Sequence, residues 1–193
     1  MCGIVGITSA KEVTSRIIGS LKKLEYRGYD SAGIATISEN NINEVKCEGR
    51  VNELEKNVNQ INLSGTIGIG HVRWATHGKP STINAHPHSS DNVSVVHNGI
   101  IENSTILKKI LEKKGYKFKS QTDTEVIVHL VTDYLKKNNI KDTIIKVLKK
   151  LHGSFALGII FKDQPDLIIG ARRGSPLAAV SYTHLTLPTS CCV

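Results

Sequence analysis

Aromatic residues make up only 5% of the 193-residue sequence, with a single tryptophan and three phenylalanines. The net charge is nevertheless +8, from 25 basic and 17 acidic residues. Nucleic-acid surfaces commonly place aromatic side chains among basic ones, so that bases can stack on them. No aromatic platform is interleaved with the lysines here. The pattern therefore favours solvated lysine faces on helices over a polyanion site, and we expect no nucleic-acid partner.

Cysteine is also scarce, and its spacing excludes common metal motifs. The four cysteines are Cys2, Cys47, Cys191 and Cys192, with no Cys-x-x-Cys pair and no His/Cys cluster. We therefore expect no metal and no other cofactor. Six histidines also lack the spacing of metal ligands and are interpreted as packing or loop residues: His71, His86, His88, His97, His129 and His152.

Long apolar runs are missing as well. No run approaches the roughly 18–20 residues that a membrane-spanning helix needs, so we expect no membrane association. The opening MCGIVGI lacks the basic region of a secretory signal. These features, with the few cysteines, predict a cytoplasmic location in a reducing environment.

What is present is a globular composition, with 39% hydrophobic and 22% charged residues, which suits one domain. We expect that domain to cover residues 2–180. Residues 181–193 (SYTHLTLPTSCCV) have no clear periodicity and form an atypical tail, which is excluded from the predicted fold.

Apolar spacing predicts an α+β chain with layers rather than regular βαβ alternation. Expected strands cover 3–8, 34–38, 43–48, 66–73, 93–97, 155–161 and 167–171, and those at 34–38 and 43–48 pair around the turn Glu39-Asn40-Asn41. Expected helices cover 11–24, 103–115, 122–135 and 142–153. The long polar stretch 74–92 between two strands is typical of a functional or mobile loop.

Cys2 is the first candidate catalytic residue. Removal of the initiator methionine would leave a residue with both a thiol and a free α-amine. Such an amine has an ordinary pKa of about 7.7–8.0, so a fraction is neutral and can accept the thiol proton. The alternative is that Cys2 is simply a small buried residue, and position alone favours that alternative.

A second candidate is GHVRWATHG, from Gly70 to Gly78. The planar guanidinium of Arg73 suits a carboxylate ligand, and Thr76 and His77 add polar contacts. Taken alone, the motif favours an ordinary surface arginine beside a packed Trp74.

A third candidate is HNGIIEN, which contains Asn98-Gly99. An Asn-Gly pair after a strand is a strong hairpin signal, and without further context a tight turn is favoured. Alternatively, the Asn98 amide and the Gly99 backbone N–H can both point at one oxygen and form an oxyanion hole.

A fourth candidate is TDTE, from Thr122 to Glu125. Asp123 lies near a predicted helix start, where an acidic side chain usually caps the helix. The functional alternative is a carboxylate that receives a substrate ammonium.

Together these motifs are specific, because they occur in a fixed order over residues 2 to about 177: MCGIVGI, LEYRGYDSAG, GHVRWATHG, NAHPH, VVHNGIIEN and TDTEVI. The chain resembles the N-terminal glutaminase domain of the isomerising glutamine–fructose-6-phosphate aminotransferases, within the class II N-terminal-nucleophile glutamine amidotransferases. The resemblance implies a four-layer αββα sandwich with Cys2 at the end of a central strand.

The resemblance also implies roles for individual residues. Cys2 would attack the side-chain amide of L-glutamine, and Asn98 and Gly99 would hold the oxyanion. Arg73 would bind the α-carboxylate and Asp123 the α-ammonium. The remaining residues have supporting roles: Trp74, Thr76 and His77 in a loop that closes over glutamine, and Arg27 as a brace for the active-site backbone.

Members of this family continue into sugar-isomerase subdomains that bind fructose 6-phosphate and receive the ammonia. That region is missing from these 193 residues. We therefore expect the chain to hydrolyse glutamine to glutamate and ammonia without making glucosamine 6-phosphate itself. The missing isomerase domain is the expected partner, and the full-length enzyme is expected to be a homodimer.

Overall fold

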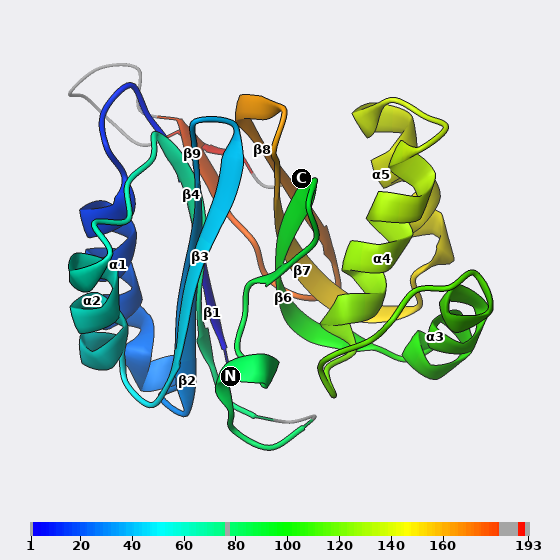
Figure 1. Cartoon of the computed structure of the whole chain (residues 1–193), viewed down its shortest axis with the longest axis horizontal. Coiled ribbons are helices and arrows are strands. Elements are labelled where there is room, and N and C mark those ends of the chain that lie inside the picture. The colour runs from blue at the N-terminus through cyan, green and yellow to red at the C-terminus, as the bar shows by residue number, and fades with distance from the viewer. Residues whose placement is uncertain (1, 76–77, 182–188, 192–193) are drawn as a thin grey trace.

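Two four-stranded antiparallel sheets pack face to face in the computed structural model, which describes residues 2–75, 78–181 and 189–191 (Figure 1). Sheet A has the strand order β1-β4-β2-β3, and sheet B has the order β5-β6-β7-β8. The strands of sheet A are β1 (Gly3–Thr8), β2 (Ser31–Ser38), β3 (Asn41–Glu48) and β4 (Ile67–Arg73). Those of sheet B are β5 (His88–Ser89), β6 (Val93–Ile101), β7 (Gly153–Phe161) and β8 (Gln164–Arg173).

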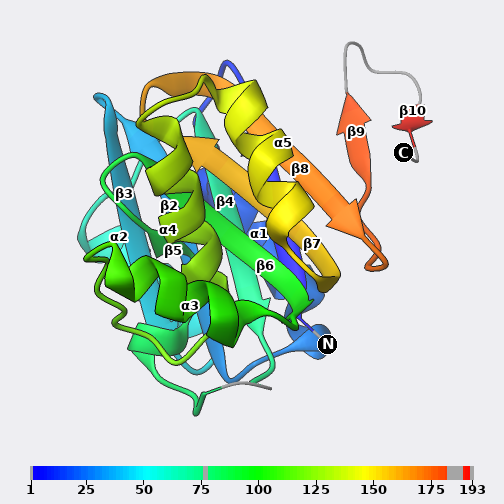
Figure 2. The same ribbon diagram turned by 90° about the vertical axis from the view of Figure 1, so that its right-hand side faces the viewer.

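Helices cover the outer face of each sheet (Figures 1 and 2). Sheet A is covered by α1 (Thr14–Leu24) and α2 (Val51–Gln60). Sheet B is covered by α3 (Ser104–Lys113), α4 (Thr124–Leu135) and α5 (Ile140–Lys150). Two short 3₁₀ turns, η1 (Glu25–Arg27) and η2 (Thr82–Asn84), complete this part of the chain. The predicted four-layer αββα sandwich is confirmed.

Three apolar layers hold the sandwich together, since each sheet face must be buried against a neighbour. The layer between the sheets contains small and β-branched side chains: Ala35, Ile37, Ile67, Ile69, Val96 and Ile160. A second layer lies under α1 and α2, and a third, the largest, lies between sheet B and its helices.

The hairpin between β2 and β3 follows the predicted turn. Glu39 and Asn40 have φ of 51° and 57°, and Ser38 pairs with Asn41 across them. Two consecutive residues with positive φ form the turn whose twist matches that of paired strands. The predicted strand pair is therefore confirmed, with both strands longer than expected.

Helix α2 and the place of β1 in its sheet differ from expectation. Helix α2 was not predicted, although Val51, Leu54 and Val58 are buried at helical spacing. Strand β1, which follows Cys2, lies at the edge of sheet A among the described residues, so the implied central strand is wrong. No helix in the described ranges is both long and apolar enough to cross a membrane.

Strands β9 (Ala179–Ser181) and β10 (Thr189–Cys191) form a separate antiparallel pair. Figure 2 shows this pair standing beside the sandwich rather than extending either large sheet.

Candidate active site

Cys2 lies where β1 meets the end of β4, and four hydrogen bonds fix it. The Trp74 N–H donates to Cys2 Sγ at 3.2 Å, and Sγ lies 3.5 Å from the Trp74 carbonyl. The Cys2 carbonyl accepts from Arg27 Nε at 3.1 Å and from Asn98 Nδ2 at 3.3 Å. Arg27 thus contacts the backbone of the candidate nucleophile.

The environment of the thiol favours its protonated form. Burial raises the pKa of Cys2, and the Trp74 N–H and the Arg73 charge oppose this effect without reversing it. A thiol of this kind needs a nearby proton acceptor before it can act as a nucleophile.

Asn98 and Gly99 lie inside β6 and not at a hairpin turn, so the turn interpretation is wrong. They pair with Ala156 and Phe155 of β7. Gly99 has φ of +121°, and a Cβ placed there would lie 2.1 Å from the Ser154 carbonyl oxygen. Only glycine fits this strand position, because the backbone of β7 passes so close.

Arg73 ends β4 and is only 4% exposed, whereas Trp74 is 47% exposed. The favoured reading of a surface arginine beside a packed tryptophan is therefore wrong. Arg73 Nη2 donates to the Gly78 carbonyl at 3.1 Å. The Trp74 ring meets Tyr29 edge-on at 5.4 Å. Thr76 and His77, also predicted site residues, lie outside the described residues.

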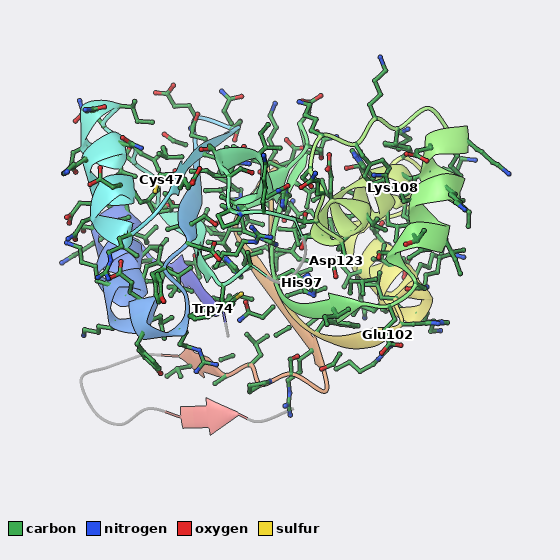
Figure 3. All side chains as sticks on the ribbon, turned by 90° about the horizontal axis from the view of Figure 1, so that it is seen from below. Cys47, Trp74, His97, Glu102, Lys108 and Asp123 are labelled. Carbon is green, nitrogen blue, oxygen red and sulfur yellow. The ribbon has the colours of Figure 1, made fainter. Side chains whose placement is uncertain are left out.

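Asp123 immediately precedes α4, but its side chain makes no capping hydrogen bond to that helix. Instead Asp123 Oδ2 accepts from the backbone N–H of Ile101 at 2.7 Å, and Oδ1 lies 3.7 Å from His97 Nδ1. The capping interpretation is wrong, because the carboxylate faces β6. Figure 3 shows Asp123 beside His97 on the sheet B side, and Trp74 on the sheet A side.

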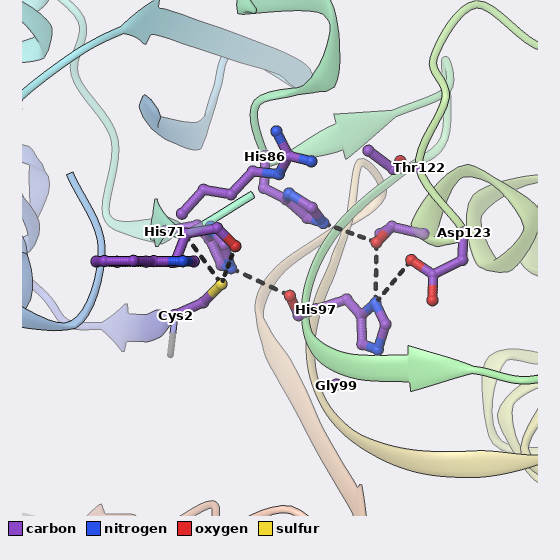
Figure 4. Close-up of a pocket in the computed structure, with 10 residues that line it drawn as sticks. Cys2, His71, His86, His97, Gly99, Thr122 and Asp123 are labelled. Atoms are coloured by element: carbon purple, nitrogen blue, oxygen red, sulfur yellow. Dashed lines mark hydrogen bonds and ion pairs between the residues drawn. The ribbon is translucent and has the colours of Figure 1, made fainter. Parts of the chain in front are cut away.

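One pocket brings these groups together (Figure 4). Of the predicted residues, Cys2, Arg73, Trp74, Gly99 and Asp123 line it. Asn98 and Arg27 do not line the pocket, but both donate hydrogen bonds to the backbone carbonyl of Cys2, which does. The pocket thus offers a thiol, a cation and an anion. Five further lining residues were not predicted as site residues: His71, His86, His97, Thr122 and Thr124.

The unpredicted histidines belong to a buried cluster that forms part of the pocket wall. His71, His86, His88 and His97 are each at most 5% exposed, so the packing interpretation holds for them. The His71 and His86 rings stack at 4.4 Å, and His88 meets His86 edge-on at 4.8 Å. Burial lowers the pKa of His71 and of His88 to about 3 and lowers those of His86 and His97.

Threonine hydroxyls link the cluster to the start of α4. Thr124 Oγ1 lies 2.7 Å from His86 Nε2 and 2.9 Å from His97 Nδ1, and Thr122 Oγ1 lies 2.9 Å from His88 Nε2. Burial keeps these rings neutral, and the described residues contain no group of side chains suited to a metal ion. In the sequence, only the alternation of His86 and His88 pointed to this layer.

A family model described as a glutamine amidotransferase domain matches residues 72–180. The isomerising glutamine–fructose-6-phosphate aminotransferase of Clostridium acetobutylicum is 54% identical over 179 residues, which is 92% of this chain and 29% of that protein. The corresponding protein of Bradyrhizobium diazoefficiens is 52% identical with the same coverage. The chain therefore spans less than a third of these relatives.

Solved structures agree on the fold. The glutamine phosphoribosylpyrophosphate amidotransferase of B. subtilis superimposes with a TM-score of 0.73 at 30% identity, covering 84% of this chain and 35% of that chain. A glutamine aminotransferase class-II domain protein of Silicibacter pomeroyi gives 0.58 at 15% identity, covering 80% and 76%, and supports the fold alone.

Proposed function

Because this chain belongs to the glutamine amidotransferase domain family, we propose that it hydrolyses L-glutamine to glutamate and ammonia with Cys2 as the nucleophile. The observation that carries the proposal is the single pocket containing the Cys2 thiol, the Arg73 guanidinium and the Asp123 carboxylate. Glutamine presents an amide, a carboxylate and an ammonium, and each finds a complementary group there.

Substrate binding uses the two opposite charges. Arg73 binds the α-carboxylate through two parallel N–H donors, and Asp123 accepts from the α-ammonium. Because a simple amide lacks both charges, this pair selects for an amino acid. In the same proposal Trp74, Thr76 and His77 belong to the loop that closes over glutamine, and Arg27 braces the backbone at Cys2.

The chemistry begins once Met1 has been removed. The free Cys2 amine takes the thiol proton, and Sγ attacks the side-chain carbonyl carbon of glutamine. Asn98 and Gly99 donate to the oxyanion of the tetrahedral intermediate. The amine then gives its proton to the leaving nitrogen, ammonia departs, and water hydrolyses the γ-glutamyl thioester to release glutamate and regenerate the thiol.

The acceptor of the ammonia is a further part of the proposal. Relatives named glutamine–fructose-6-phosphate aminotransferase are more than three times the length that this chain covers. We therefore assign residues 2–180 as the ammonia-donating domain of an enzyme that converts fructose 6-phosphate to glucosamine 6-phosphate. Its sugar-isomerase domain is the partner, and the whole enzyme is a cytoplasmic homodimer.

The proposal is tested by measuring glutamate release from glutamine by the chain, after mass spectrometry has shown that Met1 is removed. Glutamate release that disappears in Cys2→Ala supports the proposal. Cys47→Ala is the matched control, since Cys47 is buried in sheet A under α1 and α2 and should leave turnover unchanged. Equal turnover in Cys2→Ala and the unsubstituted chain would refute the role of Cys2.

A further inference from the structure

His71 contacts the amide that the proposed mechanism uses as an oxyanion donor. Its Nε2 lies 2.9 Å from Asn98 Oδ1 and 3.1 Å from the His97 carbonyl oxygen. A backbone carbonyl can only accept a hydrogen bond, so Nε2 must carry the proton. The Asn98 atom that faces this N–H must then be the amide oxygen.

The Cys2 carbonyl leads independently to the same orientation of Asn98. It lies 3.3 Å from Asn98 Nδ2 and, as an acceptor, requires the amide nitrogen on that side. Two backbone carbonyls, one in β6 and one beside β1, therefore leave a single consistent orientation of Asn98. Its NH₂ group faces Cys2, which is where an oxyanion hole needs its donors.

The His71 ring is held rigidly enough to impose this orientation. It is fully buried in β4 and stacks on His86 with an interplanar angle of 27°. Burial lowers its pKa to about 3, so the ring is neutral and has one N–H. Nδ1 has no hydrogen-bond partner among the described residues, and in the Nε2–H tautomer it carries no proton and is therefore an unpaired acceptor rather than an unpaired donor.

We propose that His71 is a positioning residue that holds the Asn98 amide with its NH₂ group toward the oxyanion. This inference rests on the proposed glutaminase function. Without the His71 donor, only the 3.3 Å contact with the Cys2 carbonyl holds the Asn98 amide, which can then rotate and present its oxygen to the oxyanion. The expected consequence is a loss in the transition state with little change in binding of neutral, ground-state glutamine.

A pair of matched substitutions tests the proposal. The amide nitrogen of His71→Gln reaches the place of Nε2, whereas that of His71→Asn reaches only the place of Nδ1. We expect His71→Asn to lower kcat by about 10- to 100-fold with KM nearly unchanged, below the roughly 100- to 1000-fold typical of a removed oxyanion donor. His71→Gln should retain most of the turnover.

Combination with Asn98→Ala separates positioning from packing. In the Asn98→Ala background, His71→Asn should have almost no further effect on kcat, because the amide that it orients is gone. Equal fold losses in both backgrounds, or equal losses for the Asn and Gln variants, would overturn the proposal.

Nitrogen-15 NMR of the His71 ring tests the tautomer in the unsubstituted protein and needs no variant to fold. A proton on Nε2 at neutral pH supports the proposal, and a proton on Nδ1 overturns it. Absence of glutamate release by the unsubstituted chain would instead count against the proposed function, and the tautomer measurement distinguishes the two failures.

Discussion

The Cys2 thiol and the Trp74 backbone contact each other across 72 residues of sequence, through an N–H to Sγ distance of 3.2 Å and an Sγ to O distance of 3.5 Å. Gly3 pairs with Val72 in the adjoining ladder. One strand pairing therefore places both Cys2, the proposed nucleophile, and Arg73, which immediately precedes Trp74. Cys2 and Arg73 are both positioned by sheet A, whereas Asp123 precedes α4, which covers sheet B.

The close approach at Gly99 predicts a large difference between two glycine substitutions. In Gly99→Ala the new Cβ would lie 2.1 Å from the Ser154 carbonyl, at a φ that alanine rarely adopts. We expect a loss of several kcal/mol in the free energy of unfolding, about 3 kcal/mol or more, because two backbones must separate. Chemical denaturation of the variant and of the unsubstituted chain measures this loss.

Gly19→Ala is the matched control. Gly19 lies inside α1, where an added Cβ meets nothing within 4 Å. Because alanine is the better helix former, this variant should gain about 0.5–1 kcal/mol. Similar stability of the two alanine variants would contradict the close approach at Gly99.

Asp123→Asn should weaken glutamine binding while keeping the fold. The amide oxygen of asparagine can still accept from the Ile101 N–H, but the negative charge is lost. A charge-assisted hydrogen bond contributes about 1.5–3 kcal/mol, so KM should rise roughly 10- to 100-fold. Asp133→Asn, which removes a charge paired with exposed Lys114, should leave KM within about twofold. An unchanged KM in Asp123→Asn would argue against ammonium binding at this carboxylate.

Arg73→Lys should be poorly tolerated, although it keeps the charge. A lysine ammonium cannot present the planar pair of donors that a carboxylate matches, nor the third donor to the Gly78 carbonyl. We expect kcat/KM for glutamine to fall at least about 10-fold, mainly through KM. In exposed Arg50→Lys, whose partner is Glu25, both constants should be unchanged. Equal values of kcat and KM for the two lysine variants would show that Arg73 does not bind the α-carboxylate of glutamine.

The buried histidines predict an acid-sensitive fold. His71 and His88 have pKa values of about 3 in the folded chain, whereas the unfolded chain takes up these protons near pH 6.5. Stability is therefore fully present above about pH 6.5 and is lost as the pH falls toward 3. Each such histidine contributes a slope approaching about 1.4 kcal/mol per pH unit.

Unfolding curves between pH 6 and pH 5 isolate this effect. Glu125, whose pKa is lowered to about 2, adds its own loss only below about pH 4.5. His88→Gln should make the slope shallower, and exposed His152→Gln should not. A stability that stays constant from pH 7 to pH 5 would mean that the histidines are not neutral and buried.

Most elements follow from local patterns in the sequence. Positive φ at Glu39 and Asn40 gives the expected hairpin, and the helix over 14–24 has the predicted apolar face. Helix α2 was overlooked because only Val51, Leu54 and Val58 are buried along it, and the surrounding polar residues conceal a spacing that is helical.

The sequence by itself determined the family, the layered α+β fold and the set of candidate residues, because motif order and short-range spacing are local properties of the chain. Only the tertiary structure decided what those residues do to one another. Asn98-Gly99 has the composition of a turn, yet pairing with β7 places it in a strand. Asp123 has the position of a helix cap, yet its carboxylate accepts a hydrogen bond from the backbone N–H of Ile101 in β6. The buried His71 donor that orients Asn98 exists only because β4 and β6 face each other across the inter-sheet layer, a contact between segments 27 residues apart that no local pattern encodes.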